Sequence, residues 1–243
     1  VGESLAEIAS VLDDLGREQE ALDYYRRALR VERKAGDERA EGETLNNRGI
    51  VFNLLGKKLE ALDYYHRALK IRHDLGDQRT EGDILSNIGK TCDDLGEERE
   101  AISYFERALP IRDAVNDIRG KAVTLNNIGL AYAALGDLQE ALDYLNEALP
   151  LREATGDRRG KAYTLTNLAW VYLELGEFQH ALNYLTESLS ISREIPNPSG
   201  EADALRNIGA THLRMGETLR AVQYFMMALQ IQERLRDPLT QLR

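Results

Sequence analysis

Residues 125–157 read LNNIGLAYAALGDLQEALDYLNEALPLREATGD, and variants of this segment recur along the chain every 40 residues. Each copy contains a leucine or methionine followed by glycine, and these glycines are Gly16, Gly56, Gly96, Gly136, Gly176 and Gly216. A tyrosine column has the same spacing without exception: Tyr24, Tyr64, Tyr104, Tyr144, Tyr184 and Tyr224. A fixed period of this length is typical of repeat architectures. The chain therefore predicts a single array of six copies, roughly residues 1–37, 38–77, 78–117, 118–157, 158–197 and 198–237.

Each copy predicts two α-helices. In the second copy, apolar or small residues recur every three or four positions through Leu45, Gly49 and Phe52, as on one face of an amphipathic helix. The same period resumes from Ala61 to Ile71. Gly56 tolerates the left-handed backbone that ends a helix, and aspartates such as Asp77 can cap the next one. No segment shows the alternation of a half-buried strand, so the predicted fold class is all-α.

A column of small residues lies in the middle of each first helix: Ala9, Gly49, Gly89, Gly129, Ala169 and Gly209. Glycine in a helix interior costs about 0.5–1 kcal/mol relative to alanine. The repeated glycine therefore predicts close approach of the two helices, with alanines of the second helix filling the space. Each pair keeps apolar surface that only a neighbouring pair can cover, so a linear α-solenoid is expected.

The composition narrows the function classes. The chain has 43% apolar and 30% charged residues, no apolar run of membrane-spanning length and one cysteine. With a net charge of −10, the chain lacks the excess of basic residues that is typical of a nucleic-acid-binding protein. These features predict a soluble protein of a reducing, cytoplasmic compartment that binds neither nucleic acid nor membrane. Because the first copy begins inside its first helix, we also expect a fragment of a longer protein.

The order of residues in each copy resembles the tetratricopeptide repeat. In the second copy the matching residues are Leu45, Gly49, Phe52, Ala61, Tyr65 and Ala68. The period of 40 in place of about 34 and the strings LNNIGLAYAALGD (125–137) and ALPIRDAVNDIRGKA (108–122) are similar to a longer variant. Such arrays occur in large bacterial proteins fused to caspase-like CHAT or nucleotide-binding signalling domains. The resemblance implies a right-handed α-solenoid that binds protein partners in a concave groove.

No residue pattern favours catalysis. The four histidines (His66, His73, His180 and His212) lack metal-ligand spacing and are expected on the surface, so no metal or cofactor is predicted. Cys92 stands in the column of Phe52 and Tyr132, which predicts a packed thiol and not a nucleophile. The tyrosine column predicts packing, although a base-stacking ladder is the alternative. The chain is therefore not expected to be an enzyme.

An asparagine column is the strongest indication of a binding site. It comprises Asn47, Asn87, Asn127, Asn167 and Asn207, all in the middle of first helices. Asparagine is a mediocre helix former, so its repeated use needs a reason. In tetratricopeptide proteins, asparagine at the matching position often bonds to the backbone of a bound peptide. The alternative is that each amide bonds to the neighbouring repeat.

Positions beside this column differ along the array. Acidic residues stand there in the second and third copies: Glu43, Asp83 and Asp93. Apolar residues replace them in the fourth and fifth copies: Leu130, Tyr163, Trp170 and Leu173. Trp170 is the only tryptophan, and packing against the next helix pair is the alternative to its role as an anchor. The predicted ligand is a peptide or helical segment, basic at one end and apolar at the other.

The second functional hypothesis is self-association through the terminal helices, or an intramolecular platform that regulates a fused effector domain. It depends on apolar residues such as Leu5, Tyr224, Phe225 and Ile231. These residues are expected to face a neighbour that the 243 residues do not supply.

Overall fold

The computed structural model describes residues 1–236 and contains twelve α-helices within them. The helices of the first half are α1 (Gly2–Asp14), α2 (Glu18–Ala35), α3 (Glu38–Leu54), α4 (Lys58–Asp74), α5 (Gln78–Asp93) and α6 (Glu98–Ala114). Those of the second half are α7 (Ile118–Leu135), α8 (Leu138–Ala154), α9 (Arg158–Glu174), α10 (Phe178–Glu194), α11 (Pro198–Arg214) and α12 (Thr218–Arg236). The predicted all-α array of six two-helix repeats is confirmed.

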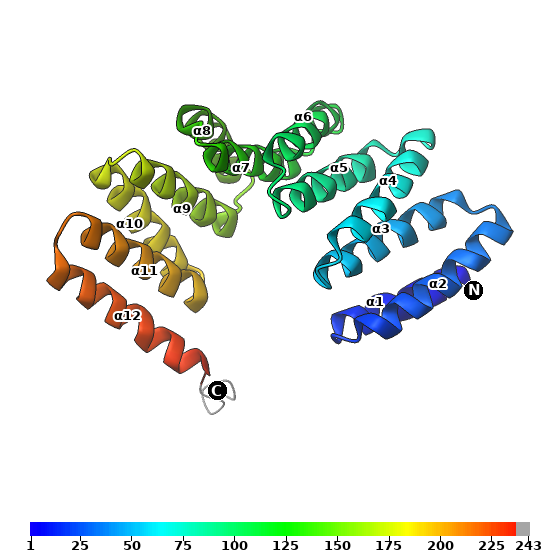
Figure 1. Ribbon diagram of the computed structural model, residues 1–243, viewed down its shortest axis with the longest axis horizontal. Helices are drawn as coiled ribbons and strands as arrows, with labels where there is room; N and C mark the ends of the chain where they lie inside the picture. The colour runs from blue at the N-terminus through cyan, green and yellow to red at the C-terminus, as the bar shows by residue number, and fades with distance from the viewer. Residues whose placement is uncertain (237–243) are drawn as a thin grey trace. The chain divides into compact units, whose positions relative to one another are not determined.

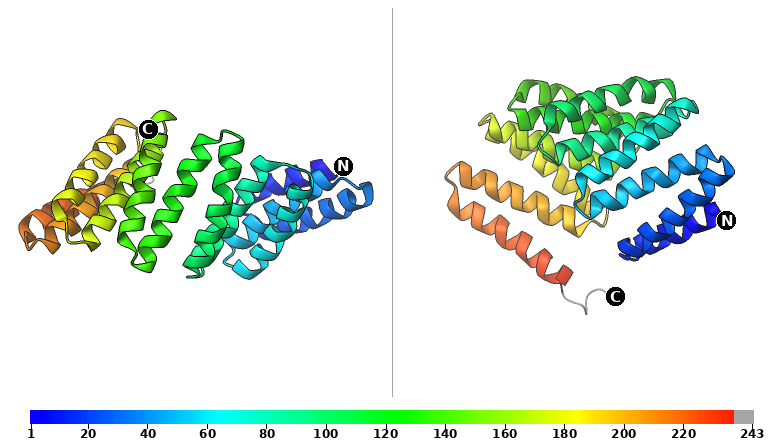
Figure 2. Two further views of the ribbon diagram at one scale, coloured as in Figure 1. Left: turned by 90° about the horizontal axis from the view of Figure 1, so that it is seen from above. Right: turned by 45° about the vertical axis from the view of Figure 1, so that its right-hand side comes forward.

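The chain divides into two compact units, residues 1–120 and the residues from Lys121 on. Within the first unit, α1 packs on α2, α3 on α4 and α5 on α6, and each pair packs on the next through α2–α3 and α4–α5. Within the second unit, α9 packs on α10 and α11 on α12, while α8–α9 and α10–α11 join successive pairs (Figure 1). Figure 2 shows the same pairs from two further sides.

Local signals end the helices as the sequence predicts. Gly56 has φ of 73°, and Asn116, which replaces the linker glycine, has φ of 51°. Asparagine is among the residues that tolerate this left-handed region. Asp77 caps α5, because its side chain accepts a hydrogen bond from the Thr80 amide at 3.4 Å.

The small-residue column allows the close approach that the sequence predicts, but aromatic and leucine side chains occupy the space in place of alanines. A Cβ atom added to Gly49 would lie 2.5 Å from Cε1 of Tyr65, and one added to Gly89 would lie 2.7 Å from Cε1 of Phe105. Tyr65 and Phe105 are both fully buried. The missing side chain on the first helix therefore makes room for a large one on the second.

The tyrosine column packs against other side chains of the array, within the pair at Tyr64 and Tyr144 and against His66 of the preceding pair at Tyr104. Tyr64 stacks on Phe52 with ring centroids 5.1 Å apart, and Tyr144 stacks on Tyr132 at 5.4 Å. This arrangement agrees with the packing interpretation, since these rings contact other side chains of the array. Cys92 is also buried as predicted.

Candidate interaction surfaces

The asparagine column joins first helices of successive pairs at two positions. The amide of Asn87 donates to Oδ1 of Asn46 at 3.3 Å, which links α5 to α3. The amide of Asn167 donates to Oδ1 of Asn126 at 3.0 Å, which links α9 to α7. Asn126 also accepts from the hydroxyl of Thr164 at 3.1 Å. Asn87 and Asn167 therefore have the alternative role, which is a hydrogen bond to the neighbouring repeat.

The other three asparagines, Asn47, Asn127 and Asn207, are half-buried on the corresponding faces of α3, α7 and α11. Asn47 also lines a pocket in the first unit. Their amides combine donor and acceptor groups in one side chain.

An apolar surface lies on the first helices of the second unit. Tyr163 is 58% exposed and Trp170 is 41% exposed, and both are on α9 with Asn167 between them. Val123 is exposed and Leu130 is half-buried on α7. The spacing 163, 167 and 170 places three side chains on one face of the helix. The apolar face predicted for the fourth and fifth copies thus contains two large exposed aromatic side chains.

The sequence assigns Leu173 to this exposed face, but in the structure its side chain is buried. Its side chain is only 8% exposed and belongs to a core cluster with Leu185 and Leu205. Three residues beyond Trp170, the helix has turned by about 300°, that is, about 60° back toward α10. The exposed position in that turn is held by Glu174.

The predicted acidic residues lie in three different environments. Glu43 is exposed on α3 and lies 4.0 Å from the guanidinium of Arg72. Asp83 accepts a hydrogen bond from Arg112 at 3.1 Å. Asp93 is half-buried, and burial, followed by repulsion from Asp94 and Glu98, raises its pKa. Glu43 and Asp83 are thus exposed carboxylates, whereas Asp93 holds the repeat position equivalent to Leu173 and is partly buried.

A column of buried arginines, which sequence reasoning missed, joins neighbouring helices. Arg72, Arg112 and Arg152 are buried near the ends of α4, α6 and α8. Arg72 donates to Oδ2 of Asp77 at 2.9 Å and to the carbonyl oxygen of Arg39 at 3.0 Å. The signal is present in the sequence, because arginine and aspartate recur five residues apart in three copies. These pairs fix the second helix of a repeat to the cap of the next first helix.

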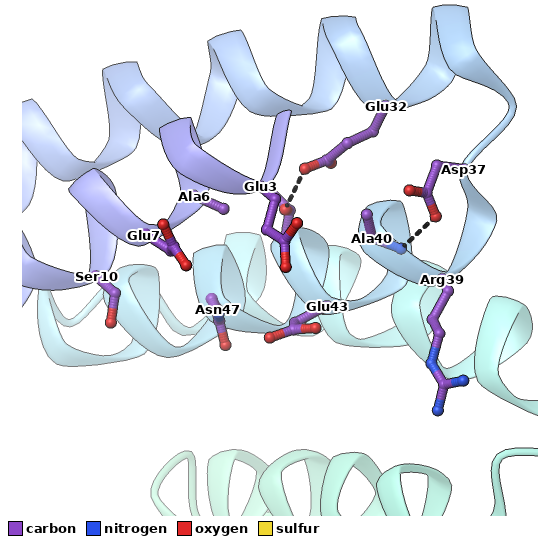
Figure 3. A pocket seen from close by; sticks show the side chains of 11 residues that line it. Glu3, Ala6, Glu7, Ser10, Glu32, Asp37, Arg39, Ala40, Glu43 and Asn47 are labelled. Atoms are coloured by element: carbon purple, nitrogen blue, oxygen red, sulfur yellow. Dashed lines mark hydrogen bonds between the residues drawn. The ribbon is translucent and has the colours of Figure 1, made fainter. Parts of the chain in front are cut away.

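The first copy departs from this pattern and contains a pocket of about 490 Å³. Glu32 of α2 stands where the next three copies have arginine, and Figure 3 shows it pointing into this pocket between α1 and α3. The hydroxyl of Thr44 donates to Oε1 of Glu32 at 3.0 Å. Burial is the largest cause that raises the pKa of Glu32, and the carboxylates of Asp37, Glu41 and Glu43 add to it.

Two titratable residues outside this pocket, His212 and Cys92, are buried. His212 is buried, not solvated: it lies 2.7 Å from Glu217 and stacks on Tyr224. Cys92 lies within 4.8 Å of a carboxylate oxygen of Glu97 and one of Glu100. Burial raises the pKa of Cys92 to about 12, which disfavours the thiolate that a metal ion would need. No metal site is assigned there.

None of the helices within residues 1–236 is both long enough and apolar enough to span a bilayer. A search of curated proteins found no match. Solved structures are similar in fold at low sequence identity. BtubC (BKLC) from P. vanneervenii has a TM-score of 0.79 and 19% identity over 90% of this chain and 92% of that chain.

A signal-transduction ATPase with numerous domains and a tetratricopeptide repeat sensor, from Pyrococcus horikoshii, has a TM-score of 0.81 and 18% identity. That match covers 94% of this chain and 36% of the larger protein. PilW, a type IV pilus biogenesis factor, has a TM-score of 0.74 and 19% identity over 99% of this chain and 97% of that chain.

Family models for the tetratricopeptide repeat match residues 2–74, 41–114, 120–194 and 202–237. These segments together cover nearly the whole sequence. The chain therefore belongs to the tetratricopeptide repeat family.

Proposed function

We propose that this protein is an interaction module that binds a peptide or helical segment of a partner along the exposed faces of its first helices. Tetratricopeptide repeats are generally protein-interaction modules, which supports the broad class. The second unit would receive apolar side chains of the partner through Tyr163, Trp170 and Leu130. Exposed carboxylates of the first unit, Glu43 and Asp83, would favour basic side chains.

The exposure of Trp170 beside Tyr163 is the observation that carries this proposal. The equivalent positions in the neighbouring first helices of that unit hold Leu130 and Ala210, which are smaller. Large aromatic side chains exposed together on one face are characteristic of partner sites. Tryptophan and tyrosine are also enriched among residues that dominate binding energy. Asn127 would add a hydrogen bond to the backbone of the ligand.

A displayed library of random peptides, selected against the 243-residue chain, tests the proposal and does not require an identified partner. Selected peptides are then titrated by fluorescence anisotropy against the wild type and variants. Trp170→Ala should weaken binding by about 2 kcal/mol or more, roughly thirtyfold. Asn127→Ala should cost less, about 0.5–1.5 kcal/mol, because one hydrogen bond is lost.

Leu59→Ala is the matched control, since Leu59 is an exposed apolar residue on a second helix, α4. This variant should bind as tightly as the wild type. Trp170 is also the only tryptophan of the chain, so its emission reports directly on ligand contact at this place. Selected peptides that bind Trp170→Ala unchanged and leave the emission unaltered would exclude this face as the site.

Self-association is the second candidate, and an exposed stripe on α12 favours it. Val222, Met226 and Leu229 are all exposed and lie three or four residues apart. Sedimentation velocity at increasing concentration would show a dimer that Met226→Glu abolishes. A monomer at every concentration would remove this candidate.

A further inference from the structure

The pocket of the first unit contains carboxylates where the next three copies contain an arginine–aspartate pair. In those copies the aspartate that caps the following helix uses its two oxygens differently. Oδ1 of Asp77 accepts from the Thr80 amide, and Oδ2 accepts from Arg72. Asp157 repeats this division, with Gly160 on Oδ1 and Arg152 on Oδ2.

The first copy keeps the acceptor but not the arginine. Oδ1 of Asp37 accepts from the Ala40 amide at 3.1 Å, as in the later copies. Oδ2 of Asp37, the oxygen that receives a guanidinium elsewhere, has no hydrogen bond among residues 1–236. The residue five positions earlier is Glu32 instead of arginine. Two carboxylates therefore face a place that a guanidinium occupies in three other copies.

Glu32 is buried although one of its carboxylate oxygens has no hydrogen bond within residues 1–236. Its side chain is only 2% exposed, and Oε2 is buried with no hydrogen-bond partner in the described part of the chain. A buried carboxylate oxygen without a hydrogen bond is costly while the group is ionised, and an approaching cation favours that ionised form. The free oxygen and the pocket together indicate a ligand and not only a solvated acidic surface.

The other charged residues that line the pocket are mostly acidic and also favour a cation. Glu3 and Glu7 of α1 and Glu43 of α3 line it together with Glu32 and Asp37. Arg39 is the one basic residue in the lining, and Figure 3 shows it extending away from Glu32. The guanidinium of Arg39 lies 3.9 Å from Asp77 instead. Glu41, nearby, is paired with Arg33 at 2.6 Å.

We propose that this pocket binds the guanidinium group of an arginine side chain from the partner segment, with Glu32 and Asp37 as its acceptors. The planar guanidinium presents several N–H donors in a fixed fork, which suits two carboxylates on different elements better than a lysine ammonium does. This inference rests on the proposed function, because it names the basic side chain that the bound segment carries. It gives the acidic unit a defined arginine socket.

A small probe tests the pocket without the rest of the peptide. N-acetyl-arginine-amide is titrated into isotope-labelled protein, and amide shifts of Ala6, Ala40 and Thr44 are followed by NMR. The lysine analogue and the neutral citrulline analogue are titrated in parallel. We expect saturable shifts with the arginine probe, with a Kd on the order of millimolar, and weaker binding of the other two.

Three variants separate recognition from folding. Glu32→Gln removes the charge but keeps an acceptor for Thr44, and should weaken the arginine probe about tenfold. Glu32→Arg should rebuild the internal pair with Asp37, abolish probe binding and raise Tm. Glu106→Gln is the charge-matched control, because Glu106 is exposed on α6 outside the pocket, and it should bind the probe normally.

The outcomes are distinct from those of the Trp170 experiment. Trp170→Ala should leave probe binding unchanged, so a failure of the peptide-binding proposal does not produce a failure here. Equal binding of the citrulline analogue, equal binding of the lysine analogue, or full binding by Glu32→Arg would each overturn the arginine socket. Weaker probe binding by Glu32→Gln and loss of binding by Glu32→Arg, with normal binding by Glu106→Gln, support it.

Discussion

Arg48 is a charged residue at a repeat position that is apolar in the other copies. Equivalent positions in the other copies hold Ile8, Ile88, Ile128, Leu168 and Ile208. The Arg48 side chain is buried on α3, and its Nε has no hydrogen-bond partner in the described chain. Its guanidinium lies 4.5 Å from the centre of the Tyr64 ring. Burial lowers the pKa of Arg48, which reflects the cost of removing its charge from water.

Arg48→Ile should therefore stabilise the protein. Replacing a buried charge by an apolar residue of suitable volume is often neutral or favourable. We expect Tm to rise by about 2–4 °C, which corresponds to about 1 kcal/mol in a protein of this size. Thermal unfolding followed by circular dichroism measures it. Arg67→Ile is the control, because Arg67 also lies over Tyr64 but is exposed, and a fall in Tm for Arg48→Ile alone would mean that the cation–π contact outweighs burial.

Two glycines of α5 provide a matched pair. A Cβ atom on Gly89 would lie 2.7 Å from Phe105, whereas one on Gly82 would have nothing closer than 3.6 Å. Gly89→Ala should destabilise by about 1–3 kcal/mol through overpacking. Gly82→Ala should stabilise by about 0.5–1 kcal/mol, because alanine is the better helix former. Urea unfolding of both variants measures the difference, and effects of the same sign would contradict the packing argument.

At the scale of single elements, the sequence predicts helix ends well because caps are local. Gly56 and Asp77 act within a few residues of their own position, and both predictions are confirmed. Two features could not be predicted so directly. Arg112 reaches Asp83, 29 residues earlier in the chain, so its role depends on tertiary packing. The prediction for Leu173 is wrong because an error of one position on a helix rotates a side chain by about 100°.

The residue that caps α5, Asp77, should make the stability of the fold depend on pH. Burial alone would raise the pKa of Asp77, but hydrogen bonds from the hydroxyl and amide of Thr80, and the charges of Arg72 and Arg39, hold it below the ordinary 3.8. A carboxylate whose pKa is depressed by folding stabilises the folded state above its unfolded pKa. That contribution is lost as the pH falls through the folded pKa.

Asp77→Asn should therefore be less stable than the wild type at pH 7, and the difference should shrink in acid below pH 3.8. Asp77→Ala should lose about 0.5–2 kcal/mol more, because the cap is removed as well. Urea unfolding across the pH range measures both. Asp63→Asn, which removes an exposed partner of Arg67, should change little at any pH. A difference for Asp77→Asn that persists unchanged in acid would contradict the ionic contribution.

At the scale of the whole molecule, the regular period gives the array a modular character. In the second unit, α8 packs on α9 just as α10 packs on α11, so these two contacts are equivalent by the repeat. Stability in such arrays is approximately a sum of repeat and neighbour contributions. Removing one complete 40-residue copy should therefore join equivalent surfaces, whereas removing one helix should not.

Deletion of residues 158–197 should yield a folded protein in which α8 packs on α11, with helical content per residue close to that of the full chain. Deletion of residues 178–197 removes only α10 and its core side chains Leu185 and Leu189. The remaining α9 and α11 are both first helices, and neither offers the large side chain that fills the small-residue position of the other. We expect this shorter deletion to lower Tm further, although it removes half as many residues. Circular dichroism and urea unfolding compare the two, and a 40-residue deletion that unfolds as readily as the 20-residue one would show that the copies are not interchangeable units.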